Sequence, residues 1–190
     1  MVRAKEGNKK DELLKAARYL FATQGVSHTP VSHIVNKAGV AQGTFYLYFA
    51  SKEDVLNKIA EQVADELFQQ VISIIDPPST KAVSKLLKIH TILTQAFEKD
   101  KEQENAQVKT RLTDALIAKF KEPLAAILKQ GVKEGTFKNS HPEETAMLIL
   151  YSAKPFIESC DKKFQAKWGD VHLDFILKGL GYKDSFNKLM

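Results

Sequence analysis

The residues best suited to chemistry in this sequence lie in the short run 42–48, QGTFYLY. A Gln side chain can pair with adenine, a Thr can contact a base or a thymine methyl, and a Leu can cover that methyl. Tyr hydroxyls can bond phosphate oxygens. The run therefore predicts reading of a DNA major groove by Gln42, Thr44 and Leu47, with Tyr46 and Tyr48 on phosphates.

A short helix over residues 42–49 would hold this surface outward. At about 100° per residue, Phe45 and Phe49 fall on one side and point to the core. The opposite side carries an exposed Leu, a Thr and a Gly but no charge, which is unusual for a face that meets only water. Gly43 would let the start of the helix approach the DNA backbone closely.

The residues on either side predict how that helix is presented. Thr29 is expected as the N-cap of a preceding helix and Pro30 in its first turn. A turn at Gly39 then joins two short helices, which is the geometry of a helix-turn-helix. Lys52, after the cap Ser51, opens a fourth helix, where a cation opposes the helix dipole. A DNA phosphate bound there would make that placement favourable.

Helical periodicity dominates the whole chain, and no alternating strand pattern is convincing. The first helix is expected from about Lys9 to Gln24 with Gly25 as its C-cap. The fourth is expected to run from residue 52 to 75 and to stop at Asp76-Pro77-Pro78. Later helices are expected near 81–100, 105–120, 123–134, 142–160 and 170–180, with a kink or break at Pro155.

The sequence thus predicts an all-α protein of about nine helices. Residues 1–50 would form a three-helix, helix-turn-helix domain, the helix over 52–75 would connect, and residues 76–190 would form a larger helical domain. The net charge is +5, and residues 1–60 carry +4 of it. This distribution favours an anionic partner of the N-terminal domain without identifying one.

Composition also narrows the class of protein. The single cysteine, Cys160, excludes an internal disulfide framework and fits a reducing compartment. No apolar run approaches the ~20 residues that a membrane helix needs, and the first residues lack a signal-peptide core. We therefore expect a cytoplasmic protein with no membrane partner.

Enzymatic interpretations find little support in the sequence. It contains no phosphate-cradling Gly-rich loop, no nucleophile elbow and no Cys-x-x-Cys. The five histidines are poorly spaced for a metal site, so surface or packing roles are expected for all of them. We expect no catalytic residue, no metal and no cofactor.

The first 60 residues resemble the TetR repressor family in a dense series of motifs: Leu13-x-x-Ala16-Ala17, Leu20-Phe21-x-x-x-Gly25, Ile34-Val35-x-x-Ala38-Gly39-Val40, Gly43-Thr44-Phe45-Tyr46-x-Tyr48-Phe49 and Ser51-Lys52-Glu53. The resemblance implies a homodimer on a palindromic double-stranded DNA operator. It implies base contacts from Gln42, Thr44 and Leu47, and phosphate contacts from Thr29, Tyr46, Tyr48 and Lys52. Two positions depart from the pattern: Ala41 replaces a common Ser or Thr cap, and Gln42 replaces a common Lys.

The resemblance also implies that the last two long helices form a four-helix dimer interface. The final predicted helix is apolar on more than one face, so both sides must be buried. A partner subunit could cover one side, although deep burial within a monomer is the alternative. The candidate interface residues are Leu148, Ser152, Val171, Phe175, Ile176 and Leu180.

The remaining helices of the C-terminal domain could enclose a pocket for a small-molecule inducer. No charged residue stands out as an anchor, so a largely apolar inducer is expected. The candidate lining residues, which could equally be plain core, are Ile92, Phe97, Leu116, Phe120, Tyr151, Phe156, Cys160 and Trp168. Two alternatives stay open: a DNA-binding regulator without small-molecule input, and a helical ligand-binding protein whose N-terminal domain no longer binds DNA.

Overall fold

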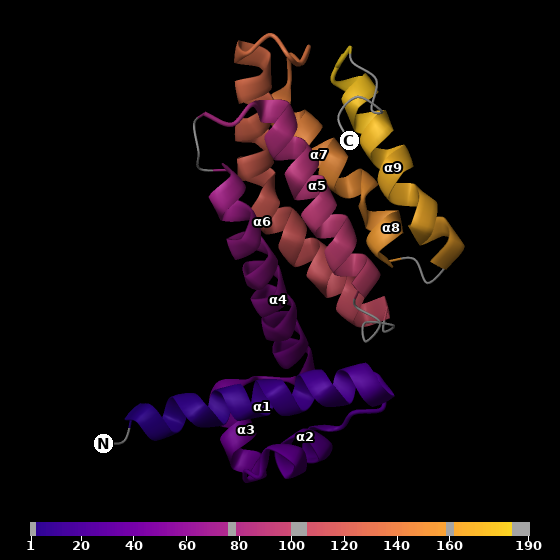
Figure 1. Cartoon of the computed structure of the whole chain (residues 1–190). Coiled ribbons are helices and arrows are strands. Elements are labelled where there is room, and N and C mark those ends of the chain that lie inside the picture. The colour runs from indigo at the N-terminus through magenta and orange to yellow at the C-terminus, as the bar shows by residue number, and fades with distance from the viewer. Residues whose placement is uncertain (1–2, 76–78, 100–105, 159–161, 184–190) are drawn as a thin grey trace. The chain divides into compact units, whose positions relative to one another are not determined.

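The computed structural model describes residues 3–75, 79–99, 106–158 and 162–183, without the side chains of 3–8, 97–99 and 162–166 (Figure 1). These residues form helices and no strand, which confirms the predicted all-α class. The nine helices of the described residues are α1 Arg3–Gln24, α2 Val31–Ala38, α3 Gln42–Tyr48, α4 Lys52–Ile75, α5 Ala82–Lys99, α6 Ala106–Lys133, α7 Pro142–Ser152, α8 Lys154–Glu158 and α9 Lys162–Gly179. None of the helices described is both long enough and apolar enough to cross a bilayer.

The chain divides into two compact units. The first comprises residues 1–63 and 101–112, and the second comprises residues 64–100 and 113–190. The helices α4 and α6 therefore contribute residues to both units.

The first unit is a helical core in which α1 packs against both α2 and α3 (Figure 1). The inward stripe of α1 is buried at Leu13, Ala16, Ala17 and Phe21, while Leu20 packs at its edge. Burial of a large apolar side chain contributes about 1.5–3 kcal/mol, so this stripe is a main source of the unit's stability. Its partners are Ile34, Val35, Phe45, Phe49, Val55, Leu56 and Ile59.

Local signals in the sequence set the turns of this unit. Gly25 and Gly39 adopt φ of +81° and +66°, where a residue with a Cβ would be strained. The N–H of Val40 then bonds to the carbonyl of Val35 at 3.0 Å and closes the end of α2. Ser51 caps α4 as expected, because its Oγ accepts the N–H of Asp54 at 3.2 Å.

The second unit corrects three predicted helix boundaries. Residues 105–120 and 123–134 were expected as two helices but lie in one, α6, which continues through Pro123. An interior proline removes one hydrogen bond, and burial of Phe120, Leu124 and Leu128 around it offsets that loss. The predicted break near Pro155 falls at Ala153, so that Pro155 sits in the first turn of α8. The final helix begins at Lys162 rather than near residue 170.

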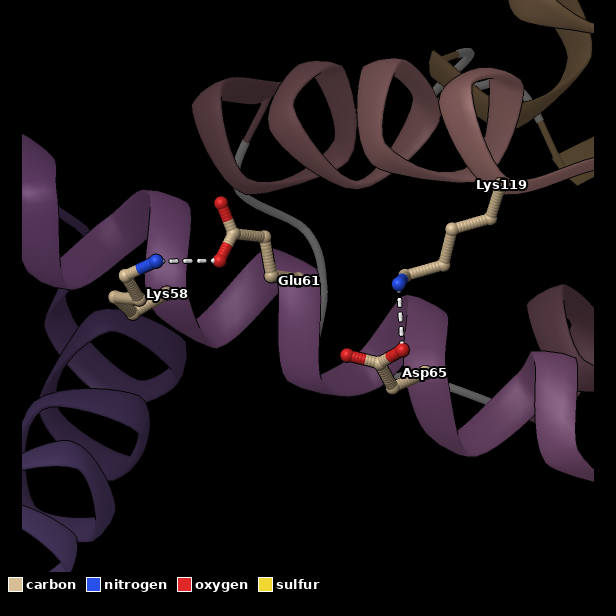
Figure 2. Close-up of polar contacts among 4 residues, drawn as sticks. All are labelled: Lys58, Glu61, Asp65 and Lys119. Atoms are coloured by element: carbon tan, nitrogen blue, oxygen red, sulfur yellow. Dashed lines mark hydrogen bonds and ion pairs between the residues drawn. The ribbon is translucent and has the colours of Figure 1, made fainter.

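Polar contacts fix the ends and flanks of α4. Buried Lys85 of α5 donates from Nζ to the carbonyl of Ile75 at 2.7 Å and so satisfies the last turn of α4. Figure 2 shows two ion pairs along α4: Lys58 with Glu61 at 2.7 Å, and Lys119 of α6 with Asp65 at 2.5 Å. Both pairs are largely solvent-exposed, so each contributes at most about 1 kcal/mol.

Gly131 packs closely against Phe137 in the second unit. The chain turns after α6, and the N–H of Phe137 bonds back to the carbonyl of Gly131 at 3.0 Å. A Cβ on Gly131 would lie 2.0 Å from Cδ2 of Phe137, which is fully inside the contact distance of two carbons. The buried Phe137 ring therefore requires glycine at this position.

We expect Gly131→Ala to lower the free energy of unfolding by about 1–3 kcal/mol, because the added methyl displaces the Phe137 ring. Gly179→Ala is the matched control, since a Cβ there meets nothing within 4 Å. Urea denaturation of both variants measures the effect. Equal stability of Gly131→Ala and the unmodified protein would contradict the packing argument.

Candidate nucleic-acid interface and ligand cavity

The helix α3 is held by two phenylalanines, as predicted. Phe45 and Phe49 are 0% and 1% exposed, and their ring centroids lie 5.6 Å apart. On the outer side, Leu47 is 80% exposed and Tyr46 is 56% exposed. The seven-residue helix therefore turns an apolar and aromatic surface to solvent.

The other predicted groove residues lie on the same exposed part of α3. Gln42 and Gly43 are exposed, Thr44 is half-buried, and Tyr48 packs partly against the core. A Cβ on Gly43 would meet nothing within 4 Å, so packing within the chain does not require glycine there. Ala41 occupies the N-cap position and makes no side-chain cap, in keeping with its departure from the family pattern.

Thr29 does not have the role expected from the sequence. Pro30, not Thr29, occupies the N-cap of α2, and Thr29 is completely buried. Its hydroxyl donates to the carbonyl of Gly25 at 2.7 Å and accepts from Nε2 of Gln24 at 3.1 Å. A buried hydroxyl that is already paired cannot reach a phosphate, so Thr29 stabilises the loop between α1 and α2.

Lys52 begins α4 as predicted and serves the same loop. Its Nζ donates to the carbonyl of Val26 at 2.7 Å. An ammonium has three N–H donors, so this bond leaves capacity for an anion. The contact ties the start of α4 to the residues that precede α2.

A cavity of about 90 Å³ lies within the second unit. Four of the predicted pocket residues line it: Leu116, Phe120, Phe156 and Trp168. The other described lining residues come from α5 to α9 and include no Lys, Arg, Asp or Glu. The cavity is therefore largely apolar in its described lining, and its polar side chains are His90, Thr94, Thr113, Trp168 and His172.

Of the remaining four pocket candidates, the two whose side chains are described do not join this lining. Ile92 lies elsewhere on α5, and Tyr151 is half-exposed on the outer side of α7. On α7 the neighbours Ile149 and Leu150 face the cavity instead, because each successive residue turns by about 100°. The side chain of Phe97 and the whole of Cys160 lie outside the described residues.

Two histidines that the sequence analysis assigned to surface or packing roles line the cavity. His90 of α5 and His172 of α9 have ring centroids 5.9 Å apart. His172 stacks on Trp168 at 5.5 Å, and its Nε2 lies 2.7 Å from Oγ of Ser152. The spacing of His90 from Leu86 and Leu93 on one apolar stripe is the sequence signal that would have placed it inside.

Burial keeps both histidines neutral. It lowers the pKa of His90 from 6.5 to about 4, and the nearby His172 adds to this effect while Asp170 opposes it. Burial also lowers the pKa of His172, against a bond to the Ile149 backbone that favours its charged form. At neutral pH the two histidines therefore offer hydrogen bonds to the cavity without a charge.

The helices α7 and α9 carry an exposed apolar surface, defined by Leu148, Tyr151, Val171 and Phe175. Leu148 is 71% exposed and Phe175 is 67% exposed. Three further interface candidates face inward: Ile176 and Leu180 are buried in the same unit, and Ser152 bonds His172. One side of α9 is therefore covered by its own chain, and the other is uncovered.

The lowered pKa of His90 predicts a loss of stability in acid. Between pH 6.5 and 4 the unfolded chain binds a proton that the folded chain does not, so the unfolding free energy falls as pH falls. His90 alone lowers the free energy of unfolding by about 2 kcal/mol at pH 5, relative to neutral pH. We expect His90→Leu to remove it, measured as the difference between the two proteins in urea denaturation at pH 7.5 and 5. An identical pH dependence in both proteins would contradict a neutral His90.

Known proteins resemble this chain at two levels, a family model of the N-terminal helices and relatives that match most of the chain. The family model described as bacterial regulatory proteins of the tetR family matches residues 13–59. The HTH-type transcriptional repressor KstR2 of Mycolicibacterium smegmatis is 31% identical over 145 residues, 69% of this chain and 68% of the relative. The fatty acid metabolism regulator protein of Bacillus subtilis is 27% identical over 152 residues, 74% of this chain and 76% of its own.

A solved structure extends the likeness to the fold of nearly the whole chain. The fatty acid degradation regulator FadR from Bacillus halodurans superimposes with a TM-score of 0.69 at 22% identity, over 92% of this chain and 97% of that one. The family model covers the helix-turn-helix described above, and the match to KstR2 extends well beyond it. This chain therefore belongs to the TetR family of bacterial transcriptional regulators.

Proposed function

We propose that the protein is a homodimeric repressor that binds a palindromic DNA operator through α3. A largely apolar small molecule in the cavity of the second unit would release it from the operator. The observation that carries this proposal is the outer face of α3, where Leu47 and Tyr46 are exposed beside Gln42 and Thr44. Exposure of such groups is costly in water and useful in a major groove, where a methyl and base edges can cover them.

The contacts assigned to this face follow from exposure and chemistry. Gln42, Thr44 and Leu47 would meet base edges, and the hydroxyls of Tyr46 and Tyr48 would meet phosphates. Gly43 would allow the DNA backbone to approach the start of the helix, since no side chain of the protein fills that space. Lys52 would bind a phosphate with the N–H donors that the Val26 carbonyl leaves free.

The cavity supports small-molecule input over a regulator that lacks it. A plain core at this position would be close-packed, with few voids larger than a water molecule. Two of the relatives are named as regulators of fatty acid metabolism or degradation, which fits an apolar inducer. Ligand binding would favour a dimer with a different spacing of its two α3 helices, and DNA would weaken ligand binding by the same factor.

The exposed apolar surface of α7 and α9 supports the homodimer. Its residues recur at spacings of three and four on two helices that the Ser152–His172 hydrogen bond joins. A second copy of the same surface would cover it in an isologous interface and form a four-helix contact. Two α3 helices could then meet successive major grooves about 34–36 Å apart.

We expect Thr44→Ala and Tyr46→Ala each to weaken operator binding by about 5- to 100-fold, because each removes a contact to DNA. A duplex selected by the protein from a random pool serves as the operator, and a gel-shift titration measures affinity. Thr23→Ala is the matched control, since the hydroxyl of Thr23 bonds only within α1. Unchanged operator affinity in the two α3 variants would refute the assigned face.

We expect Phe175→Lys to shift the protein from dimer to monomer, because a buried charge at the interface centre would lack a partner. Val132→Lys is the control: it changes an exposed apolar residue of α6 outside the α7 and α9 surface. Light scattering after size exclusion measures the mass of each variant. A Phe175→Lys protein that remains a dimer would exclude this surface as the interface.

A further inference from the structure

Nε2 of His90, a residue of the cavity lining, has no hydrogen-bond partner among the described residues. Nε2 of His90 is shielded from solvent, and no described residue offers it a hydrogen bond. Buried polar atoms are rarely left in this state, because the loss of a water hydrogen bond is then uncompensated. The position of His90 in the lining means that a bound molecule can supply the missing bond.

The other polar side chains of the lining are already engaged. Oγ of Ser152 lies 2.8 Å from the carbonyl of Ile149 and 2.7 Å from Nε2 of His172, so the Ser152 hydroxyl and this nitrogen are both engaged. The hydroxyl of Thr94 donates within α5, 2.9 Å from the carbonyl of His90 and 3.0 Å from that of Thr91. Thr113 and Trp168 also have interactions of their own. Nε2 of His90 therefore has hydrogen-bonding capacity that the hydroxyls of Ser152 and Thr94 do not offer.

The charge of the cavity limits what can pair with His90. Its described lining contains no Lys, Arg, Asp or Glu, and a buried charge without a partner is strongly disfavoured. A neutral imidazole can accept a hydrogen bond from a hydroxyl or, as the other tautomer, donate one to a carbonyl oxygen. An ionised headgroup would have no fixed counter-charge among these residues.

We propose that the ligand of this cavity is a neutral, mostly apolar molecule whose single hydroxyl or carbonyl group pairs with Nε2 of His90. The proposal rests on the function proposed above, in which the cavity binds a small molecule. The apolar body of the ligand lies against the leucines, isoleucines and Phe120, and the rings of Trp168 and His172 flank the polar group. His90 is then the residue that distinguishes such a ligand from a hydrocarbon or a free carboxylate.

The size of the cavity suits a one-ring probe that widens it slightly. An engineered apolar cavity of about 150 Å³ accepts benzene, and this one measures about 90 Å³. Phenol, toluene and benzoate have one ring each and differ in a hydroxyl, a methyl and a carboxylate. Trp168, the single tryptophan of the sequence, lines the cavity, so its fluorescence reports binding of each probe to the full-length protein.

The test compares the three probes on the unmodified protein and on cavity variants. We expect His90→Leu to weaken phenol binding about 10-fold and to change toluene binding by less than about 2-fold, because only phenol loses a hydrogen bond. His90→Gln, which keeps a polar group, should restore phenol binding to within about 3-fold. Thr91→Val is the matched control, and it should leave both affinities unchanged because Thr91 lies on α5 outside the described lining and its hydroxyl bonds the backbone.

Several results would overturn the proposal. They are equal losses for phenol and toluene in His90→Leu, tighter binding of benzoate than of phenol at pH 8, and no fluorescence response to any probe. Affinity for the selected duplex is measured in parallel with saturating phenol. Phenol that binds through His90 and leaves DNA affinity unchanged would support the ligand class and refute ligand-driven release, so the two proposals fail separately.

Discussion

The burial of Phe45 and Phe49 is the interaction on which the DNA-binding surface depends. A helix of seven residues has no independent stability in water, so α3 exists because two of its side chains enter the core of the first unit. Once those rings are buried, helix geometry fixes the directions in which the other side chains of α3 point. Gln42, Thr44, Tyr46 and Leu47 lie on the remaining surface, and their exposure follows from the anchor.

Two polar residues near that anchor form hydrogen bonds within the protein that stabilise the fold. Thr29 and Lys52 each satisfy a carbonyl of the loop between α1 and α2, at Gly25 and Val26. Within the loop the N–H of Thr29 bonds the carbonyl of Val26 at 3.2 Å, and the two side chains add to this backbone contact. For Thr29 this use is complete and excludes a phosphate contact, whereas Lys52 keeps donors to spare. Burial therefore decides which of these two residues has a structural role alone and which can also contact DNA.

The second unit combines a largely apolar cavity, which includes a few polar side chains, with an exposed apolar face. These features share the helix α9: Trp168, His172 and Ile176 face the cavity, and Val171 and Phe175 face outward. A helix with apolar residues all round can connect a ligand site to a dimer contact, because movement on one face is transmitted to the other. In the proposed function this gives α9 a direct part in coupling ligand to dimer geometry.

The sequence by itself determined the features that depend on near neighbours: the caps and turns at Gly25, Gly39 and Ser51, the inward phenylalanines of α3 and the all-α class. The 3.6-residue periodicity of a helix and the positive φ of a glycine depend only on residues close in sequence. It also identified Leu116, Phe120, Phe156 and Trp168, because aromatic and aliphatic residues on amphipathic helices face inward. Only the tertiary structure decided that α6 continues through Pro123, that Thr29 is buried, that Ile176 and Leu180 face inward and that His90 enters the cavity. Each of these outcomes depends on which neighbouring helix covers a given side chain, and residues distant in sequence supply that cover.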